Sequence, residues 1–561
     1  MTASLVLPPA LVLLAGAGLM ALSRGVAHRA IMLAAPLLAL ALVWSLPDGV
    51  GWTLDWMGYE IAPLRADRLS RWFGTVFCLM AFAGGVFALT QPNRMETTAA
   101  TAYAGAALGV VFAGDMLSLF VFWELMALAS TTVILAAGPE ARAGGLRYLA
   151  LHLLGGVVLM IGLAGEIAAS GSTAFTAMAP DTPARWLILI GFLVNAGAWP
   201  LSSWLPDAYP RASFSGMVTL SAFTTKTAVF VLIVGFPGAS VLIPIGLFMV
   251  FYGIVYAILE NDMRRILAYS IINQVGFMVT GIGIGTDLAL DGAASHAFAH
   301  ILYKALLLMS AGSVLYVTGR TKCTELGGLF RSMPFTTTCA IVGALAISAF
   351  PLTSGFVTKS MITDAAGREG LIWVWYLLGA ASAGVFLHAG IKFPWFVFFQ
   401  RDSGLRPAEP PVTMRLAMAL LAVACILFGV APDLLYPHLP FASVYAPYDG
   451  GHVVAQTQLL LFSGLAFFIL LPALRRTETI TLDTDWLWRR LGASAWRQAS
   501  ALVAAAWHFA TLIGWAVVEQ GLIELRARLR RGSLVAEQAS STMATVTVGM
   551  LAIYLVLSLF F

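Results

Sequence analysis

Long apolar runs recur from one end of the chain to the other, and they limit its possible folds more than any other feature. Hydrophobic residues make up 60% of the 561 residues, and charged residues only 11%. A soluble domain carries roughly 25% charged residues, so this composition excludes a water-soluble globular protein. Transmembrane β-barrels are built from short strands of alternating polarity, and these runs are too long and continuous for that. At about 20 residues per span, we expect an all-α polytopic membrane protein with about 16 transmembrane helices.

The apolar runs give candidate spans whose limits are accurate to a few residues. They lie at 5–22, 30–47, 69–90, 98–113, 115–137, 146–169, 185–201, 213–235, 240–259, 266–286, 293–318, 335–364, 371–399, 416–431, 453–473 and 541–560. Arginine and lysine gather in alternate loops, for example at Arg24, Arg142, Arg264 and Arg475. The positive-inside rule places these loops in the cytoplasm and both termini on the opposite side. We expect a multi-pass protein of the bacterial inner membrane.

One basic stretch, residues 485–531, lacks the pattern of a span. It mixes Trp486, Trp488, Trp496, Trp507 and Trp515 with Arg489, Arg490, Arg497, Arg526, Arg528, Arg530 and Arg531. Aromatic and apolar positions that alternate with arginine suggest an amphipathic helix along the membrane surface or along neighbouring spans. A juxtamembrane basic tail with tryptophans at the membrane interface is the alternative.

A few charged and titratable side chains fall inside the apolar runs. They are Glu124, Lys226, His296, His300, Lys304 and Lys359, with Glu166, His388 and Lys392 nearer to the ends of spans. A charge at the bilayer centre costs at least ~2.5–3.5 kcal/mol, so each is a candidate functional residue. For Glu124 and Lys226 a structural ion pair is the alternative, Glu166 is more typical of an interfacial charge, and Lys392 is expected to reach the interface.

The strongest pattern among these residues is the spacing of His296, His300 and Lys304 at i, i+4 and i+8. This spacing places all three side chains on one face of a helix, over a rise of about 12 Å. A row of titratable groups is what a proton relay needs, because histidine titrates near neutrality and a desolvated lysine can release its proton. The alternative is a pair of neutral histidines hydrogen-bonded across helices.

Two spans contain helix-breaking residues. Pro200 and Pro206 interrupt one, and Pro351 interrupts the span that carries Lys359. Proline frees backbone carbonyls, and transporters often build their sites at such breaks. By contrast, the four cysteines are scattered and no phosphate-binding glycine motif occurs. We therefore expect no metal, cofactor or nucleic-acid site.

Seven strings in this order are similar to one family. They are FWELMALAS, PLSSWLPDAYP, SAFTTK, ENDMRRILAYSIINQVGFM, HAFAHILYKALLLM, ELGGLFRSMP and PLTSGFVTKS, between about Leu69 and Phe399. The chain resembles the antiporter-like subunits shared by Mrp-type Na+/H+ antiporters, respiratory complex I and membrane-bound hydrogenases, with the closest resemblance to the D subunit of Na+/H+ antiporters. The resemblance implies two inverted five-helix repeats, each holding a half-channel.

The resemblance also implies a division of the chain and a set of site residues. The segments would be 1–97 (N-terminal helices), 98–235 and 240–399 (the two repeats), 400–480 (C-terminal helices), 481–540 (amphipathic lateral segment) and 541–561 (last helix). The proton relay would consist of Glu124, Lys226, His296, His300, Lys304 and Lys359. The partners would be other membrane subunits, protons, a monovalent cation and the lipid bilayer.

One position departs from the family pattern. Asn195 stands where the family usually has a lysine paired with the glutamate at 124, and Ser202 stands where a histidine is common. A neutral amide cannot tune a neighbouring group by gaining or losing charge. The first half-channel is therefore expected to differ from that of its relatives.

Three functions remain open at this point. The first is a proton-translocating subunit of a multi-subunit Na+/H+ antiporter. The second is a proton-pumping subunit of an NADH:quinone oxidoreductase or hydrogenase-type complex, and the third is a scaffold subunit that conducts nothing. In each case the chain would be a transporter or complex subunit and not a catalyst by itself.

Overall fold

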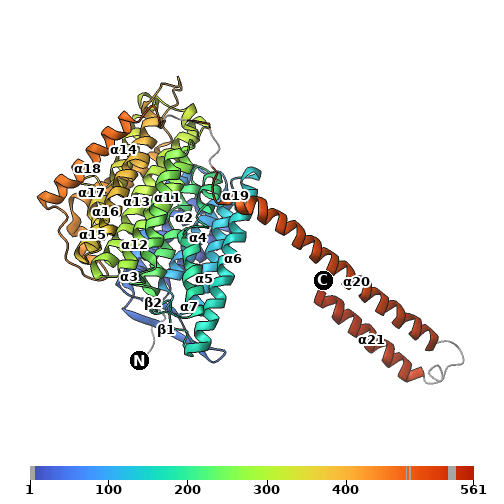
Figure 1. Cartoon of the computed structure of the whole chain (residues 1–561). Helices are drawn as coiled ribbons and strands as arrows, with labels where there is room; N and C mark the ends of the chain where they lie inside the picture. Colours follow the sequence, from blue (N-terminus) through green and yellow to red (C-terminus); the bar gives the residue numbers. More distant parts are fainter. Residues whose placement is uncertain (1–6, 475–476, 479–481, 529–538, 561) are drawn as a thin grey trace. The chain divides into compact units, whose positions relative to one another are not determined.

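The computed structural model describes residues 7–474, 477–478, 482–528 and 539–560. It separates into two units, Met1–Asp485 and Trp486–Phe561. The first unit holds α1 (Pro9–Leu22), α2 (Gly25–Ser45), β1 (Gly49–Trp56), β2 (Tyr59–Ala66), α3 (Arg68–Phe87), α4 (Arg94–Phe112), α5 (Met116–Leu135), α6 (Pro139–Ser170), α7 (Pro183–Ala196), α8 (Trp204–Ala208), α9 (Gly216–Leu220), α10 (Thr224–Gly235), α11 (Leu242–Leu259), α12 (Met263–Ile284), α13 (Asp287–Thr318), α14 (Pro334–Ile347), α15 (Ser354–Arg368), α16 (Ile372–Val385), α17 (Val412–Val430) and α18 (Gly450–Ile469). The helices of this unit pack side by side as a bundle (Figure 1).

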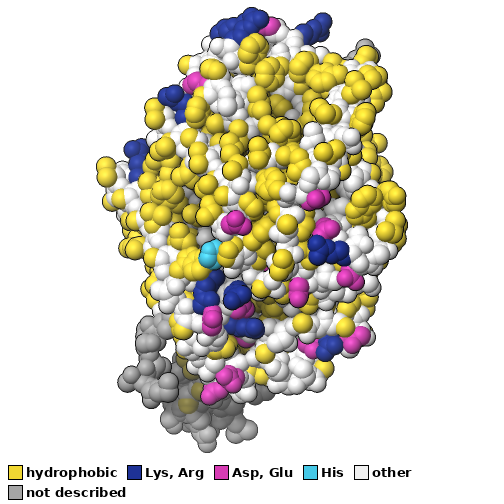
Figure 2. All heavy atoms as spheres, turned by 90° about the vertical axis from the view of Figure 1, so that its left-hand side faces the viewer, with side chains coloured by type: hydrophobic (Ala, Val, Ile, Leu, Met, Phe, Trp, Pro, Cys, Tyr) yellow, Lys and Arg dark blue, Asp and Glu magenta, His cyan; other side chains and the backbone are white. Residues whose placement is uncertain are grey.

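Every predicted span overlaps a helix, so the chain is a polytopic α-helical membrane protein. In the described part of the chain, 12 helices are long and apolar enough to cross a membrane, and four shorter apolar helices lie at Pro9–Leu22, Pro183–Ala196, Pro334–Ile347 and Ala544–Tyr554. Figure 2 shows a broad zone of hydrophobic side chains across one face of the molecule, with basic side chains at its upper end. This zone is the surface expected to face lipid or other subunits.

The second unit contains two long helices, α20 (Ala493–Arg528) and α21 (Ala539–Phe560). The stretch Arg489–Ala527 also has the length and hydropathy of a membrane span. The lateral placement of residues 485–531 therefore stays a prediction. Arg530 and Arg531, which belong to its basic pattern, lie outside the described residues.

The structure contains a β-hairpin that the sequence patterns did not predict. Strands β1 and β2 pair antiparallel, and the turn between them has positive φ at Met57 (52°) and Gly58 (83°). Two successive residues with positive φ give the tight turn that suits the twist of a hairpin. Asp115 fastens this hairpin to the bundle, because its carboxylate accepts a hydrogen bond from Ala62 N at 3.0 Å and also caps α5 through Ser118 N at 2.8 Å.

Both predicted helix breaks are present, and a third occurs that no proline signals. Helix α7 ends at Ala196 with Gly197 at φ 79°, and residues 348–353 separate α14 from α15. The unpredicted break, residues 221–223, separates α9 from α10. Lys226 and Lys359 each follow such a break within two turns of helix, where freed carbonyls make a polar surrounding.

The centre of the bundle is formed by α12 and α13. In α12 the whole apolar window is buried, and in α13 78% of it is. Helix α13 packs against α3, α12, α14, α15 and α17. The face that carries the two histidines and Lys304 thus lies away from lipid, in the interior of the protein.

One arginine at the start of α12 binds the irregular segment between α8 and α9. The Arg264 guanidinium is 3% exposed and donates to the backbone oxygens of Pro210 (2.9 Å), Ala212 (2.9 Å) and Ser213 (2.7 Å). These three carbonyls belong to the irregular stretch between α8 and α9. The arginine therefore stabilises a segment outside the long helices of the bundle.

We expect Arg264→Met to destabilise the protein strongly. The change leaves three carbonyls without their donor, and each unsatisfied buried group costs ~1–3 kcal/mol. Arg265→Met is the matched control, because the Arg265 side chain is 29% exposed and pairs with Glu260, so its loss costs at most about 1 kcal/mol. Thermal unfolding of the purified protein measures both, and equal Tm values for the two variants would contradict this assignment.

Candidate functional site

The α13 face brings the predicted relay residues together in the interior. His296, His300 and Lys304 are each 0% exposed. The ring centroids of the two histidines lie 6.3 Å apart. The predicted single face is thus present, and none of its three members forms an ion pair with an acidic oxygen within 4.0 Å among the described residues.

His296 is held by side chains from two neighbouring helices. Its Nε2 lies 3.1 Å from Gln274 Oε1 of α12, and its Nδ1 lies 3.3 Å from Thr358 Oγ1 of α15. The Tyr303 hydroxyl donates to the same Gln274 oxygen at 3.1 Å. His296 is therefore a bridge between α13 and the broken helix α15, because Thr358 directly precedes Lys359.

His300 and Lys304 have few partners. Neither ring nitrogen of His300 is hydrogen-bonded in the part of the chain that the structure describes, and its ring stands edge-on to Tyr303 at 5.3 Å. Lys304 Nζ donates to Ser270 Oγ of α12 at 2.7 Å. Since an ammonium has three donors, Lys304 keeps donors available for a water or a neighbouring group.

Lys359 lies beside a large cavity. Its Nζ has no hydrogen-bond partner among the described atoms and stands 4.8 Å from the centroid of the Phe277 ring. The cavity, of about 580 Å³, extends from Lys359 to Asp364, Asp449 and His452. Asp449 caps α18 and His452 lies in its first turn. The charge pattern of the sequence predicts that this end of α18 lies outside the cytoplasm.

In the described structure, Lys226 lies close enough to His296, His300 and Lys304 to interact with them electrostatically, whereas Glu124 has no such interaction with them. Lys226 Nζ donates to Ser221 O at 2.7 Å and Thr225 Oγ1 at 3.1 Å, both at the unpredicted break. Glu124 is partly exposed, and its Oε1 has no partner among the described atoms. No ion pair within 4.0 Å is formed by either residue in the described structure, so the alternative of a structural ion pair is not what the structure shows.

The remaining intramembrane charges have structural partners. Glu166 binds Arg185 through two hydrogen bonds, at 2.9 Å and 3.0 Å. Lys392 was expected to reach the interface, and this was wrong: it is 4% exposed and donates to the backbone oxygens of Ala257, Ile258 and Glu260 at the end of α11. The ammonium satisfies the free carbonyls of that helix end, which sequence position alone cannot reveal.

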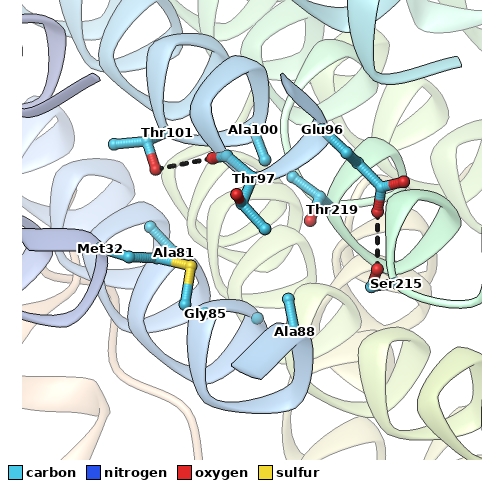
Figure 3. Close-up of a pocket in the computed structure, with 11 residues that line it drawn as sticks. Met32, Ala81, Gly85, Ala88, Glu96, Thr97, Ala100, Thr101, Ser215 and Thr219 are labelled. Carbon is cyan, nitrogen blue, oxygen red and sulfur yellow. Dashed lines mark hydrogen bonds between the residues drawn. The ribbon is translucent and has the colours of Figure 1, made fainter. Parts of the chain in front are cut away.

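The sequence patterns did not indicate that a glutamate at the start of α4 is buried. Glu96 is 2% exposed and accepts hydrogen bonds from Ser215 Oγ (2.6 Å), Ser213 Oγ (2.7 Å) and Gln91 Nε2 (3.0 Å). The neighbouring cavity in Figure 3 is lined by small and apolar residues such as Ala81 and Gly85, and its volume is about 30 Å³. A cavity of this size holds about one water, so it is no substrate site.

Comparisons with known proteins agree with the resemblance of the sequence. Residues 113–384 match the family described as NADH:quinone oxidoreductase/Mrp antiporter, TM. An uncharacterized protein of Mycobacterium tuberculosis is 30% identical over 473 residues, which cover 76% of this chain and 72% of that protein. The D subunit of the Na+/H+ antiporter of Alkalihalophilus pseudofirmus is 33% identical over 279 residues, or 46% of this chain and 56% of that relative.

The same fold is found in a solved respiratory complex. A chain of the archaeal membrane-bound sulfane sulfur reductase superposes with a TM-score of 0.71 at 23% identity, over 97% of this chain and 99% of that one. This likeness concerns the fold alone. With the family match and the relative from Mycobacterium tuberculosis, it shows that the chain belongs to the NADH:quinone oxidoreductase/Mrp antiporter transmembrane family and is a homologue of the antiporter D subunit.

Proposed function

We propose that this chain is the proton-translocating membrane subunit of a multi-subunit Na+/H+ antiporter. The observation that carries the proposal is the buried face of α13, where two histidines and a lysine line up with no acidic partner within 4.0 Å among the described residues. A cation that is buried without a counter-charge is costly, and a protein that only needed stability would use an apolar residue there. Titratable groups that remain in such a place are typical of a proton path.

The contacts suggest how a proton would move along this face. Lys304 can pass a proton toward His300, because the two residues are one turn apart on α13 and the His300 ring nitrogens have no partner among the described atoms. His300 and His296 are again one turn apart, with ring centroids 6.3 Å apart. That distance is too long for direct transfer, so an intervening water would bridge it.

The path would continue through α15 to the outside. His296 contacts Thr358, next to Lys359, and Lys359 lines the cavity of about 580 Å³. Asp364, Asp449 and His452 supply polar groups along that cavity. On the other side of the relay, Lys226 and Glu124 would connect it to the first repeat.

The partners of the chain are inferred from its relatives and from its surface. The Alkalihalophilus relative is named as one subunit of an Na+/H+ antiporter, which supports other membrane subunits as partners and Na+ or a similar cation as the exchanged ion. The chain would lie in the bacterial inner membrane. Exposed apolar side chains on α6 and α11, such as Leu154, Ile161 and Val255, supply area for lipid or for a neighbouring subunit.

A redox-driven proton pump is the second candidate. The observation that favours it is the superposition on a chain of a respiratory complex over 97% of this protein. The intramembrane chemistry would be the same, and the driving force would come from another subunit. Purification of the tagged protein from its own host in mild detergent separates the two. We expect small hydrophobic partners without flavin or iron, and flavin and iron–sulfur subunits that copurify would show the second candidate to be right.

Lys304 offers the most direct test of the relay. We expect Lys304→Ala to lower Na+-driven proton flux in everted vesicles by at least about tenfold, because the change removes the ammonium that links Ser270 of α12 to the histidine face. Lys322→Met is the control, since Lys322 is exposed in a loop between α13 and α14. The amount of assembled complex is measured in parallel. Unchanged flux in Lys304→Ala at equal assembly would contradict the relay.

The ring beneath Lys359 gives a finer test. We expect Phe277→Leu to reduce flux by about 2- to 30-fold, the range that corresponds to a cation–π contact of ~0.5–2 kcal/mol. Phe277→Tyr keeps the ring and should keep most of the flux. If both variants lose flux equally, or neither does, the contact between Lys359 and Phe277 has no part in transport.

A further inference from the structure

Three polar side chains of the first repeat lack the partners that buried groups normally have. Among the described atoms, Glu124 Oε1, both amide atoms of Asn195 and Nε2 of His152 accept or donate no hydrogen bond. Asn195 and His152 are each 1% exposed. Buried polar atoms without partners are rare in native proteins and call for a ligand, an ion or a water. These three come from α5, α7 and α6, and α6 packs against both of the other helices.

The carboxylate of Glu124 lies directly on the backbone of α6. A Cβ added at Gly156 would stand 2.0 Å from Glu124 Oε1. A side chain at position 156 would therefore displace the Glu124 carboxylate, and the absence of one leaves the room that the carboxylate occupies. Glu124 thus points toward α6 and not along the surface of α5.

Asn195 lies at the same level of α6. A Cβ at Gly155 would lie 3.1 Å from Val194 Cγ1, and one at Gly191 would lie 2.7 Å from Leu159 Cβ. Asn195 follows Gly191 by four residues, so it shares the face of α7 that meets α6. Glu124 therefore lies against Gly156 of α6, and Val194, the neighbour of Asn195, lies against the adjacent Gly155.

The same face of α7 also meets α5. Phe192 packs on Trp123 with ring centroids 5.3 Å apart, and Asn195 follows Phe192 by three residues. Trp123 is the neighbour of Glu124 in the chain. Two independent contacts thus place the Asn195 side of α7 at the junction of α5 and α6, next to the carboxylate.

His152 bounds the same region, one helical turn from Gly156. Its Nδ1 lies 2.9 Å from the backbone oxygen of Tyr148 and must donate to it, which leaves Nε2 of the neutral ring as a lone-pair acceptor. The ring packs on Trp204 at 4.7 Å, and Trp204 Nε1 donates to Val194 O at 3.0 Å. His152 is thus held in place by α8 and α7, and its Nε2 remains available to a ligand.

This cluster contains one negative charge and, among the described residues, no positive charge close to it. It offers a carboxylate oxygen, an amide oxygen and an imidazole nitrogen, all of which are electron-pair donors. No Lys, Arg or His nitrogen lies within 4.0 Å of the Glu124 carboxylate among the described residues. A single carboxylate balances one positive charge, whereas a divalent ion would leave a net charge inside the membrane.

We propose that Glu124 and Asn195, with His152 beside them, form a binding site for a monovalent metal cation such as Na+. Carboxylate and carbonyl oxygens are the ligands that hard cations prefer. A lysine at position 195 would neutralise Glu124 from within the chain, but the amide of Asn195 leaves that charge to an ion from solution. The Glu124 side chain is partly exposed, while its Oε1, the atom that would bind the ion, is buried.

The inference deepens the proposed antiport and rests on it for any role in transport, but binding can be measured without transport. The purified complex is unfolded thermally in 0–200 mM NaCl, with choline chloride keeping the ionic strength constant. We expect a saturable rise in Tm of about 2 °C or more that is specific to NaCl. Glu124→Gln and Asn195→Leu should abolish this rise. Asn195→Lys should abolish it too, with a Tm in choline that equals or exceeds that of the wild type.

The matched control is Glu166→Gln, which removes another carboxylate of the same repeat, one that is already bound to Arg185. Its Tm should be lower overall but should still rise with NaCl. A rise that persists in Glu124→Gln, or no NaCl-specific rise in the wild type, overturns the site. A wild-type Tm that responds to pH through Glu124 but not to NaCl also overturns it, because a proton then neutralises the carboxylate. The Lys304→Ala complex should keep the full rise, so failure of the relay and failure of the site are distinguishable.

Discussion

The structure depends on the burial of basic side chains in a low-dielectric interior without acidic counter-ions. Lys226, His300, Lys304 and Lys359 lie in the core of the bundle, and no ion pair within 4.0 Å is formed by any of them among the described residues. Such groups are kept where the surrounding protein supplies polar or aromatic contacts. At the helix break of residues 221–223, Lys226 binds the freed carbonyl of Ser221. Lys359 has no hydrogen-bond partner among the described atoms and instead lies over the ring of Phe277.

Two classes of buried cation can be told apart by the number of their partners. Arg264 and Lys392 each bind three backbone oxygens, which indicates a structural role. Within the described structure, Lys304 binds one hydroxyl, and Lys359 contacts the face of a ring. A group with few partners loses little when its proton leaves, whereas a group held by three carbonyls would leave them unsatisfied. Partner count thus separates the groups that can exchange a proton from those that only hold the fold.

The helices and the titratable face of α13 could be predicted from the sequence. The hairpin, one helix break and the long-range contacts could not, for physical reasons. Apolar run length located the helices, and the spacing of His296, His300 and Lys304 defined one buried face, because both are local patterns. The β-hairpin and the break before Lys226 were missed, since the first has an unusual turn at Met57 and the second contains no proline. Long-range pairs were out of reach altogether: Tyr269 donates to Asp483, 214 residues away, at 2.6 Å. Sequence also cannot tell that Lys392 caps a helix or that Glu124 lies against Gly156, because neither contact leaves a periodic signal.

The α5–α7 region and the α12–α15 region, which the resemblance assigns to different repeats, contain titratable groups of opposite kind, and this asymmetry bears on the proposed exchange. In the α12, α13 and α15 region the titratable groups are basic, and His296 is connected to its neighbours through Gln274, Tyr303 and Thr358. In the α5–α7 region, an acidic group faces neutral ligands, so its charge must be met by a proton or by an ion from solution. A carboxylate neutralised by one of these has no need of the other, since a second positive charge would be left uncompensated in the membrane. Competition between H+ and Na+ for Glu124 would then be the elementary act of exchange. In the proposed site, the amide at position 195 would permit that competition, and a fixed ammonium would remove it.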